Sequence, residues 1–324
     1  MGVRFLSTGA GLPDKVLTNA DLEKMVDTSD QWIVERTGIK ERRMAAPDQA
    51  TSDLAVLAAR HALETAHLTP ADIDLIVVAT CTPDHLFPST ACLVQKALGA
   101  VNAAAFDLSA ACSGFLFGLS AVSGMMEAGM AKRALLIGAD TLTRFTDWKD
   151  RGTCVLFGDG AGALLLEKTE GPSDLLAVHL GSDGSVSDIL SIPGGGSRHP
   201  LGSGVGEFPP FIHMEGKEVF KHAVVRMMEA MEAALKKCGK TVEDLALIIP
   251  HQANLRIIDA IAKRLKTKED KVFRNVQKYG NMSAATTIIA LDEAVRSGRV
   301  QRGDSVGLIA FGAGLTWASA ILKW

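Results

Sequence analysis

Residues 68–80 (LTPADIDLIVVAT) and residues 240–252 (KTVEDLALIIPHQ) share one rhythm, in which a polar turn leads into an apolar run of strand length. Two more pairs follow in the same order along the chain. They are 104–115 (AAFDLSAACSGF) with 271–285 (KVFRNVQKYGNMSAA), and 134–140 (ALLIGAD) with 306–314 (VGLIAFGAG). The separation stays at roughly 170 residues, which indicates an internal repeat. We predict two similar α/β halves, 1–170 and 171–324, with a site between them.

The apolar runs within these halves are short and end at glycine, proline or a polar turn, which is typical of buried, mainly parallel strands. The strands we predict are 73–79, 104–108, 134–137, 245–249, 272–276 and 305–310. The glycine-rich run 157–163 (FGDGAGA) resembles a dinucleotide fingerprint, but no βα turn with a downstream acidic residue surrounds it. We interpret it as close backbone packing and not as a nicotinamide site.

Composition narrows the class of protein. The 324 residues are 47% hydrophobic and 22% charged, with a formal net charge of -3, which predicts a packed globular protein and argues against a general nucleic-acid binder. No run reaches the roughly 20 apolar residues of a membrane span, and no secretion signal is evident, so we expect a cytoplasmic protein. Five cysteines without a C-x-x-C pair suggest neither a disulfide framework nor a zinc site.

Cys112 is the candidate nucleophile. It follows the predicted strand 104–108 and precedes an apolar helix, with the small residues Ala111, Ser113 and Gly114 around it. At a helix N-terminus, unpaired N–H groups and the helix dipole favour the reactive thiolate. The alternative is a buried structural cysteine, because free cysteine is often buried.

Two further candidates lie at strand ends in the second half. His251 follows the proline that stops the strand 245–249, and Asn281 follows the strand 272–276. A core histidine and a helix cap are the alternatives. The repeat would bring both residues to the crevice that holds Cys112, where ligand sites of open α/β sheets gather. The turn 311–316 (FGAGLT) offers backbone N–H groups suited to an oxyanion hole, unless it is an ordinary tight turn.

The segment 28–38 (TSDQWIVERTG) reads as a short helix with a capped start and a glycine stop. It places Trp32 and Arg36 four residues apart, on one face. An indole beside a guanidinium would stack an adenine and hold a phosphate. The alternative is a core tryptophan beside a solvent-facing arginine.

Together, DLSAACSGF at 107–115, PHQANLRI at 250–257, KYGNMSAA at 278–285 and FGAGLTWAS at 311–319 strongly resemble β-ketoacyl-acyl-carrier-protein synthase III. This is the initiating condensing enzyme of dissociated fatty-acid synthesis, within the thiolase superfamily. The resemblance covers essentially the whole chain. It implies a thiolase-like α/β fold in which the two halves form layers in the order αβαβα.

The resemblance also assigns roles to residues. Cys112 would carry the acyl group, His251 and Asn281 would complete the catalytic triad, and the N–H groups of Cys112 and Ala313 would form the oxyanion hole. The family often has glycine where this chain has Ala313, but alanine still supplies the N–H group. The nucleotide end of coenzyme A would contact Thr28, Trp32, Arg36 and Arg151, and its pantetheine arm would contact Asn254.

Two surfaces are implied as well. Phe87 resembles an aromatic residue that closes the acyl pocket across a dimer interface in some members. An acidic carrier protein requires a basic patch, for which the candidates are Lys221, Arg256, Lys263 and Arg264. The last three follow PHQAN at spacings of seven and eight, on one side of a helix. A solvated helix face is the alternative.

The implied reaction is a decarboxylative Claisen condensation of an acyl-CoA primer with malonyl-acyl-carrier protein, through an acyl-cysteine intermediate. It needs no metal or other cofactor, and a homodimer is expected. The alternatives are a related condensing enzyme of secondary metabolism, a cysteine hydrolase and a non-catalytic acyl-binding homologue.

Overall fold

Two mixed sheets form the centre of the molecule, which a computed structural model describes for residues 2–202 and 208–324. The first sheet has the order β1-β7-β6-β4-β5 and the second has the order β8-β13-β12-β11. In each sheet two antiparallel pairings come first; two parallel pairings follow in the first sheet and one in the second. The strand bounds are β1 Gly2–Gly11, β4 Leu75–Ala79, β5 Ala104–Leu108, β6 Arg133–Thr141, β7 Asp159–Thr169, β8 Leu175–Ser182, β11 Leu247–Pro250, β12 Ser305–Gly312 and β13 Thr316–Lys323.

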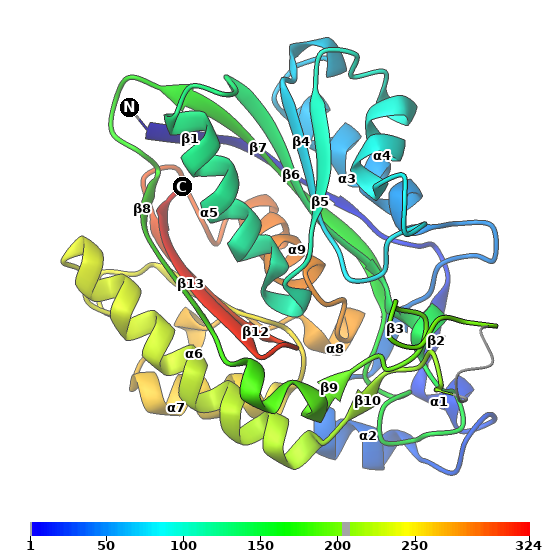
Figure 1. Ribbon diagram of the computed structural model, residues 1–324. Helices are drawn as coiled ribbons and strands as arrows, with labels where there is room; N and C mark the ends of the chain where they lie inside the picture. The colour runs from blue at the N-terminus through cyan, green and yellow to red at the C-terminus, as the bar shows by residue number, and fades with distance from the viewer. Residues whose placement is uncertain (1, 203–207) are drawn as a thin grey trace.

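Helices separate and cover the two sheets (Figure 1). Helices α5 and α9 lie between the sheets and contact strands of both, whereas α3 and α4 cover the first sheet and α6 covers the second. Helix α7 packs against α6 and shares its core cluster with residues of β11 and β12. The helix bounds are α3 Thr51–Thr65, α4 Thr90–Leu98, α5 Gly114–Glu127, α6 Gly216–Cys238, α7 Leu255–Leu265 and α9 Ala285–Arg296. The layers therefore run αβαβα, as the resemblance implies. The boundary at residue 170 stays a prediction.

Glycine allows the central helices to approach the first sheet closely. A Cβ atom at Gly138 of β6 would lie 2.6 Å from the carbonyl oxygen of Ala284, which precedes α9. A Cβ atom at Gly162 of β7 would lie 2.5 Å from Cγ2 of Ile288 in α9. These contacts agree with the interpretation of the run 157–163 as close backbone packing.

Five of the six predicted strands are present, and the one at 272–276 is wrong. Only Val272 forms a bridge, to Ile248, and the chain then turns into α8 (Val276–Tyr279). The side chain of Gln252 takes the place of a strand partner. Its Oε1 accepts hydrogen bonds from the N–H groups of Asn275 (2.9 Å) and Val276 (3.2 Å). The apolar pattern of residues 272–276 could not reveal that a side chain replaces the strand partner, because Gln252 lies in a turn distant along the chain.

Smaller elements gather below the two sheets in Figure 1. They are β2 Val16–Thr18, α1 Asn19–Leu22, α2 Asp30–Thr37, β3 Glu41–Arg43, β9 Leu190–Ser191 and β10 His213–Met214. Arg42 of β3 is fully buried and donates to the carbonyl oxygen of Val155 at 2.8 Å, which joins β3 to the segment that precedes β7. Among the described residues, no helix is long and apolar enough to cross a membrane.

Candidate active site

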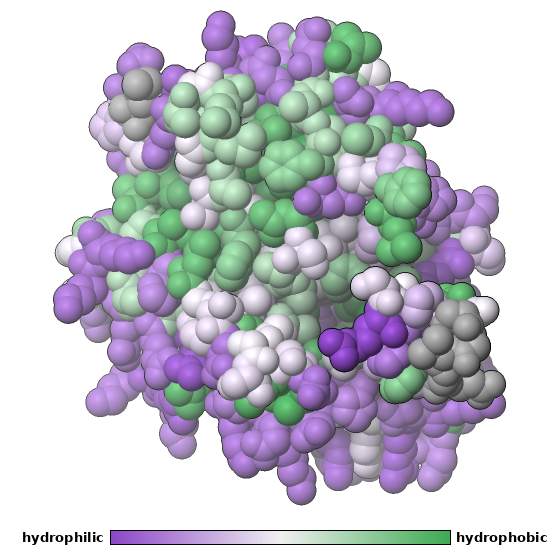
Figure 2. Space-filling view, viewed as in Figure 1, coloured by the Kyte–Doolittle hydropathy of each residue, from purple (hydrophilic) through white to green (hydrophobic). Residues whose placement is uncertain are grey.

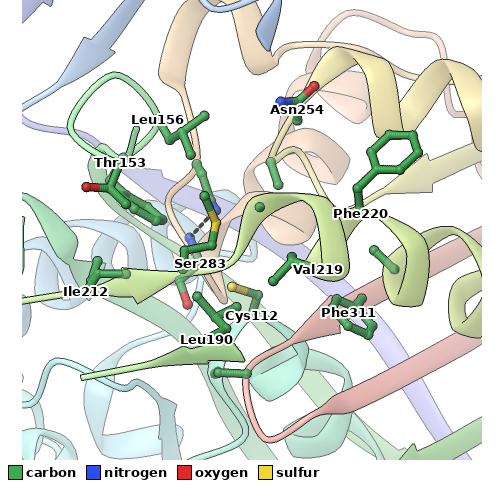
Figure 3. A pocket seen from close by; sticks show the side chains of 18 of the residues that line it. Cys112, Thr153, Leu156, Leu190, Ile212, Val219, Phe220, Asn254, Ser283 and Phe311 are labelled. Atoms are coloured by element: carbon green, nitrogen blue, oxygen red, sulfur yellow. Dashed lines mark hydrogen bonds between the residues drawn. The ribbon is translucent and has the colours of Figure 1, made fainter. Parts of the chain in front are cut away.

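One cavity of about 1230 Å³ receives the three candidate catalytic side chains, Cys112, His251 and Asn281. Cys112 comes from the first half, and the other two come from the second. Cys112 and His251 each follow a parallel strand, β5 and β11, at the edge where ligand sites of α/β sheets gather, whereas Asn281 follows α8 and forms an isolated bridge to Phe157. Figure 3 shows Cys112 with Ser283 beside it and Leu190 and Phe311 also lining the cavity. The internal repeat thus predicts which side chains converge here.

The Cys112 turn is tightly held. Residues Ala111–Ser113 form one turn of 3-10 helix, and α5 begins at Gly114. Gly312, at the end of β12, packs against this turn, since a Cβ atom there would lie 2.6 Å from the backbone nitrogen of Cys112. Any larger residue at 312 would displace Cys112.

The charge state of Cys112 differs from the sequence expectation. Burial is the main cause that raises the pKa of its thiol to about 12; a hydrogen bond with the Ser283 hydroxyl partly offsets it, and the nearby Asp140 carboxylate adds to it. Loss of solvation therefore opposes the thiolate more strongly than the hydrogen bond from Ser283 favours it. The resting group is therefore the thiol. Helix position alone misleads here because it takes no account of burial.

This pKa predicts how alkylation of Cys112 depends on pH. Only the thiolate reacts, and a pKa near 12 makes its fraction rise about tenfold for each pH unit between pH 6 and pH 9. The rate of carbamidomethylation by iodoacetamide, followed by peptide mapping, should rise by the same factor. Cys112→Ser should remove the label from this peptide. A plateau below pH 8 would mean that the helix dipole outweighs burial.

His251 is buried and held by its backbone and its ring. Its N–H group donates to the carbonyl oxygen of Ile309 at 2.7 Å, and Nδ1 lies 2.5 Å from the Thr286 hydroxyl of α9. Burial lowers the pKa of the imidazole to about 3. The ring is therefore neutral at physiological pH and carries one hydrogen.

Asn281 is fixed by a parallel bridge to Phe157. Its backbone nitrogen donates to the carbonyl oxygen of Leu156 at 2.8 Å, and its Oδ1 accepts from the N–H group of Ser283 at 2.9 Å. The N-cap residue of α9 is Ala284, so the helix-cap interpretation of Asn281 is wrong. Because Oδ1 is engaged, the Nδ2 group is left as the donor for a ligand.

The turn that carries Ala313 is fastened to the turn that carries Cys112. The Thr316 hydroxyl contacts the carbonyl oxygens of Ala110 (3.0 Å) and Ala313 (3.1 Å). In return, the Ser113 hydroxyl donates to the carbonyl oxygen of Thr316 at 3.1 Å. Ala313 also lines the cavity. The two predicted oxyanion-hole residues therefore lie on turns with a fixed mutual position.

Most of the predicted coenzyme A residues meet around Trp32. The Arg36 guanidinium lies 4.5 Å from the centroid of its ring and the Arg151 guanidinium lies 5.4 Å from it. Asn254 donates to the carbonyl oxygen of Arg36 at 3.2 Å. The Thr28 hydroxyl is buried and has no hydrogen-bond partner within residues 2–202 and 208–324.

The remaining candidates lie at the mouth or away from the cavity. Lys221 and Arg256 line it, whereas Lys263 and Arg264 are exposed in the last turn of α7. Phe87 does not line it, and its side chain is 86% exposed.

The sequence reasoning did not single out several lining residues. Cys81 lies 3.3 Å from Asp140 and 3.7 Å from the Ser283 hydroxyl. Ser283 could have been found from the sequence, because it lies in the segment KYGNMSAA together with Asn281. Cys81 and the apolar wall carry no local signal, because the wall comes from segments far apart in the chain. This wall includes Leu156, Leu190, Ile212, Val219, Phe220 and Phe311.

Comparisons with known proteins bear on this site. Models of 3-oxoacyl-acyl-carrier-protein synthase III match residues 106–184, and models of its C-terminal part match residues 235–324. A β-ketoacyl-acyl-carrier-protein synthase III from Caldanaerobacter subterraneus is 57% identical over 321 residues, or 99% of this chain and 97% of the relative. The chain belongs to the β-ketoacyl-acyl-carrier-protein synthase III family.

Solved structures support the same family assignment. The synthase III from Aquifex aeolicus matches with a TM-score of 0.92 and 48% identity over the whole of both chains. The priming β-ketosynthase of the R1128 polyketide pathway matches with a TM-score of 0.94 and 39% identity, over 99% of this chain and 96% of that one. The predicted thiolase-like fold and the prediction of a condensing acyltransferase are confirmed. The initiating condensation of fatty-acid synthesis is the function that the synthase III relatives support.

Proposed function

We propose that this chain condenses an acyl-CoA primer with malonyl-acyl-carrier protein and releases coenzyme A and carbon dioxide. The observation that carries this proposal is the meeting of the Cys112 thiol, the His251 imidazole and the Asn281 amide in one cavity, whose wall includes Trp32 and Arg36. A nucleophile at a buried floor and a cationic, aromatic wall suit a thioester of a long phosphorylated arm. Cytoplasmic location and the absence of a metal requirement stay predictions.

In the first step the Cys112 sulfur attacks the thioester carbon of acyl-CoA. The N–H groups of Cys112 and Ala313 hold the oxygen as negative charge develops on it. The carbon–sulfur bond to coenzyme A breaks, and the thiol proton ends on the departing sulfur. The proton lost by Cys112 is the one gained by coenzyme A, so no residue has to keep it as a base. This fits a cysteine that rests as the thiol.

In the second step malonyl-carrier enters and loses carbon dioxide. The electron pair of the broken bond moves toward the thioester oxygen, and two neutral donors can stabilise it there. We assign these donors to Nε2 of His251 and Nδ2 of Asn281. The resulting carbanion attacks the carbonyl carbon of the acyl-cysteine, and the carbon–sulfur bond breaks to give the 3-oxoacyl-carrier and the Cys112 thiolate. One proton taken up from solvent then restores the thiol.

Steady-state kinetics test this function. Carbon dioxide, coenzyme A and 3-oxoacyl-carrier should form in equal amounts, and varying both substrates should give the parallel reciprocal plots of a ping-pong mechanism. Free acid without carbon dioxide would instead identify a cysteine hydrolase. Preference for malonyl-CoA over malonyl-carrier would identify a condensing enzyme of another pathway.

Two variants separate the two substrates in this assay. Trp32→Ala should raise the KM for acyl-CoA about tenfold, because stacking on an aromatic ring contributes about 1–3 kcal/mol. Lys263→Glu lies away from the cavity and should raise the KM for the acidic carrier several-fold at low salt, with the effect reduced at high salt. Each variant serves as the control of the other. Equal effects on both substrates would contradict these two assignments.

We further propose a homodimer in which Phe87 contacts the partner subunit. Figure 2 shows apolar side chains gathered over α5 and β5 in the upper middle of this face. Strand β5 is an edge strand, and Phe106, Leu108 and Phe117 on these elements are only partly buried. Such an edge is suited to pairing with a second copy. Sedimentation equilibrium giving a monomer at micromolar concentration would contradict the proposal.

A further inference from the structure

We propose that Thr286 is a positioning residue that sets the tautomer of His251, by donating its hydroxyl hydrogen to Nδ1 so that the ring hydrogen stays on Nε2. This inference rests on the proposed function, because it supplies the Nε2–H group that the malonyl step needs. Thr286 belongs to the first turn of α9, between the two sheets, and is 1% exposed.

The direction of the hydrogen bond follows from a competition between two acceptors. The single hydroxyl hydrogen of Thr286 can go to Nδ1 of His251, at 2.5 Å, or to the carbonyl oxygen of Ser283, at 3.1 Å. The carbonyl oxygen already accepts the backbone N–H of Thr286 at 3.2 Å. Among the described residues, Nδ1 has no other hydrogen-bond partner. Nδ1 is nearer to the hydroxyl than the carbonyl oxygen is, and it is also the more basic acceptor, so it receives the hydrogen.

The position of the ring hydrogen decides what His251 can do. The neutral imidazole has one nitrogen that donates and one that accepts, and the hydrogen bond made by one nitrogen determines the role of the other. Burial lowers the pKa of His251 to about 3, so a second hydrogen is not available at neutral pH. With Nδ1 turned toward Thr286, Nε2 is the nitrogen left for a ligand in the cavity. Only the Nε2–H tautomer can donate to the malonyl thioester oxygen.

The chain provides a matched control one residue further along α9. Thr287 is also fully buried, and its hydroxyl has no hydrogen-bond partner among the described residues. Thr287→Val therefore removes the same atoms as Thr286→Val, from the same helix, without touching His251. Thr286→Ser keeps the hydroxyl and is the rescue variant.

Nitrogen NMR of the protein labelled with ¹⁵N-histidine gives the direct test. The wild type and Thr287→Val should both show His251 with a protonated Nε2 and an unprotonated Nδ1, identified by the loss of the signals in His251→Ala. In Thr286→Val the two nitrogen shifts should move toward each other as the tautomers interconvert. A wild-type ring protonated at Nδ1 overturns the inference.

Kinetics supply a second readout. Thr286→Val should lower kcat for malonyl-carrier decarboxylation about 10- to 100-fold, the range found for residues that orient a functional histidine, with little change in the KM for the carrier. Acylation by acyl-CoA should be unchanged, and Thr286→Ser should recover most of the rate. Equal rates in the two valine variants overturn the inference. Normal decarboxylation in His251→Ala would instead overturn the proposed role of His251, whichever tautomer the NMR finds.

Discussion

Replacing Cys112 with alanine should abolish the acyl-enzyme and lower the condensation rate by about 10³-fold or more, since removal of a covalent nucleophile leaves only binding and the oxyanion hole. Intact mass spectrometry after incubation with acyl-CoA should show one acyl adduct on the wild type and none on Cys112→Ala. We expect the acyl group on Cys112 because the turn that carries its thiol packs against Gly312 and is held next to the turn of Ala313.

Cys81 provides the control for this experiment, because it lines the same cavity and is also a thiol. Burial and the Asp140 carboxylate raise the pKa of Cys81 well above its ordinary value, so it is a poor competing nucleophile. Cys81→Ala should keep the acyl adduct. An adduct that persists in Cys112→Ala, and disappears in Cys81→Ala, would move the nucleophile to Cys81.

The variants His251→Ala and Asn281→Ala should still acylate at Cys112 but should release carbon dioxide from malonyl-carrier about 10²- to 10³-fold more slowly. This range is the effect of removing one donor from a developing oxyanion. Burst formation of coenzyme A reports acylation, and release of labelled carbon dioxide reports decarboxylation. The two measurements separate the half-reactions.

The double variant sharpens this test. If both donors hold the same oxygen, the loss in His251→Ala/Asn281→Ala should be smaller than the product of the two single losses. Loss of acylation in His251→Ala would show that the imidazole also acts on the thiol. Unchanged decarboxylation in either single variant would remove that residue from the second step.

Much of the fold and the core of the site could be predicted from local patterns. The repeat placed Cys112 and His251 at equivalent strand ends, because parallel strands of similar units end at one edge of a sheet. The prediction failed at 272–276, where an apolar run of strand length pairs through Val272 alone. Periodicity reports which side chains prefer burial, and it does not report which partner the backbone will find.

The apolar wall of the cavity could not be predicted in the same way. Its wall combines Leu156, Leu190, Ile212, Val219 and Phe311, which lie in separate segments of both halves. Each of these residues resembles an ordinary core residue in its own segment. Only their assembly around a cavity gives them a common role.

The sequence by itself predicted two similar α/β halves, Cys112 at a strand-to-helix turn and His251 at the end of a strand in the other half. These features follow from short-range patterns and their repetition, whereas the αβαβα order of layers and the catalytic roles of Cys112, His251 and Asn281 came from the resemblance to the family. The tertiary structure alone decided that Cys112 rests as a thiol and that Thr286 contacts the His251 ring. Both depend on burial and on contacts between residues distant in the chain, because solvation and hydrogen-bond geometry are properties of the packed molecule.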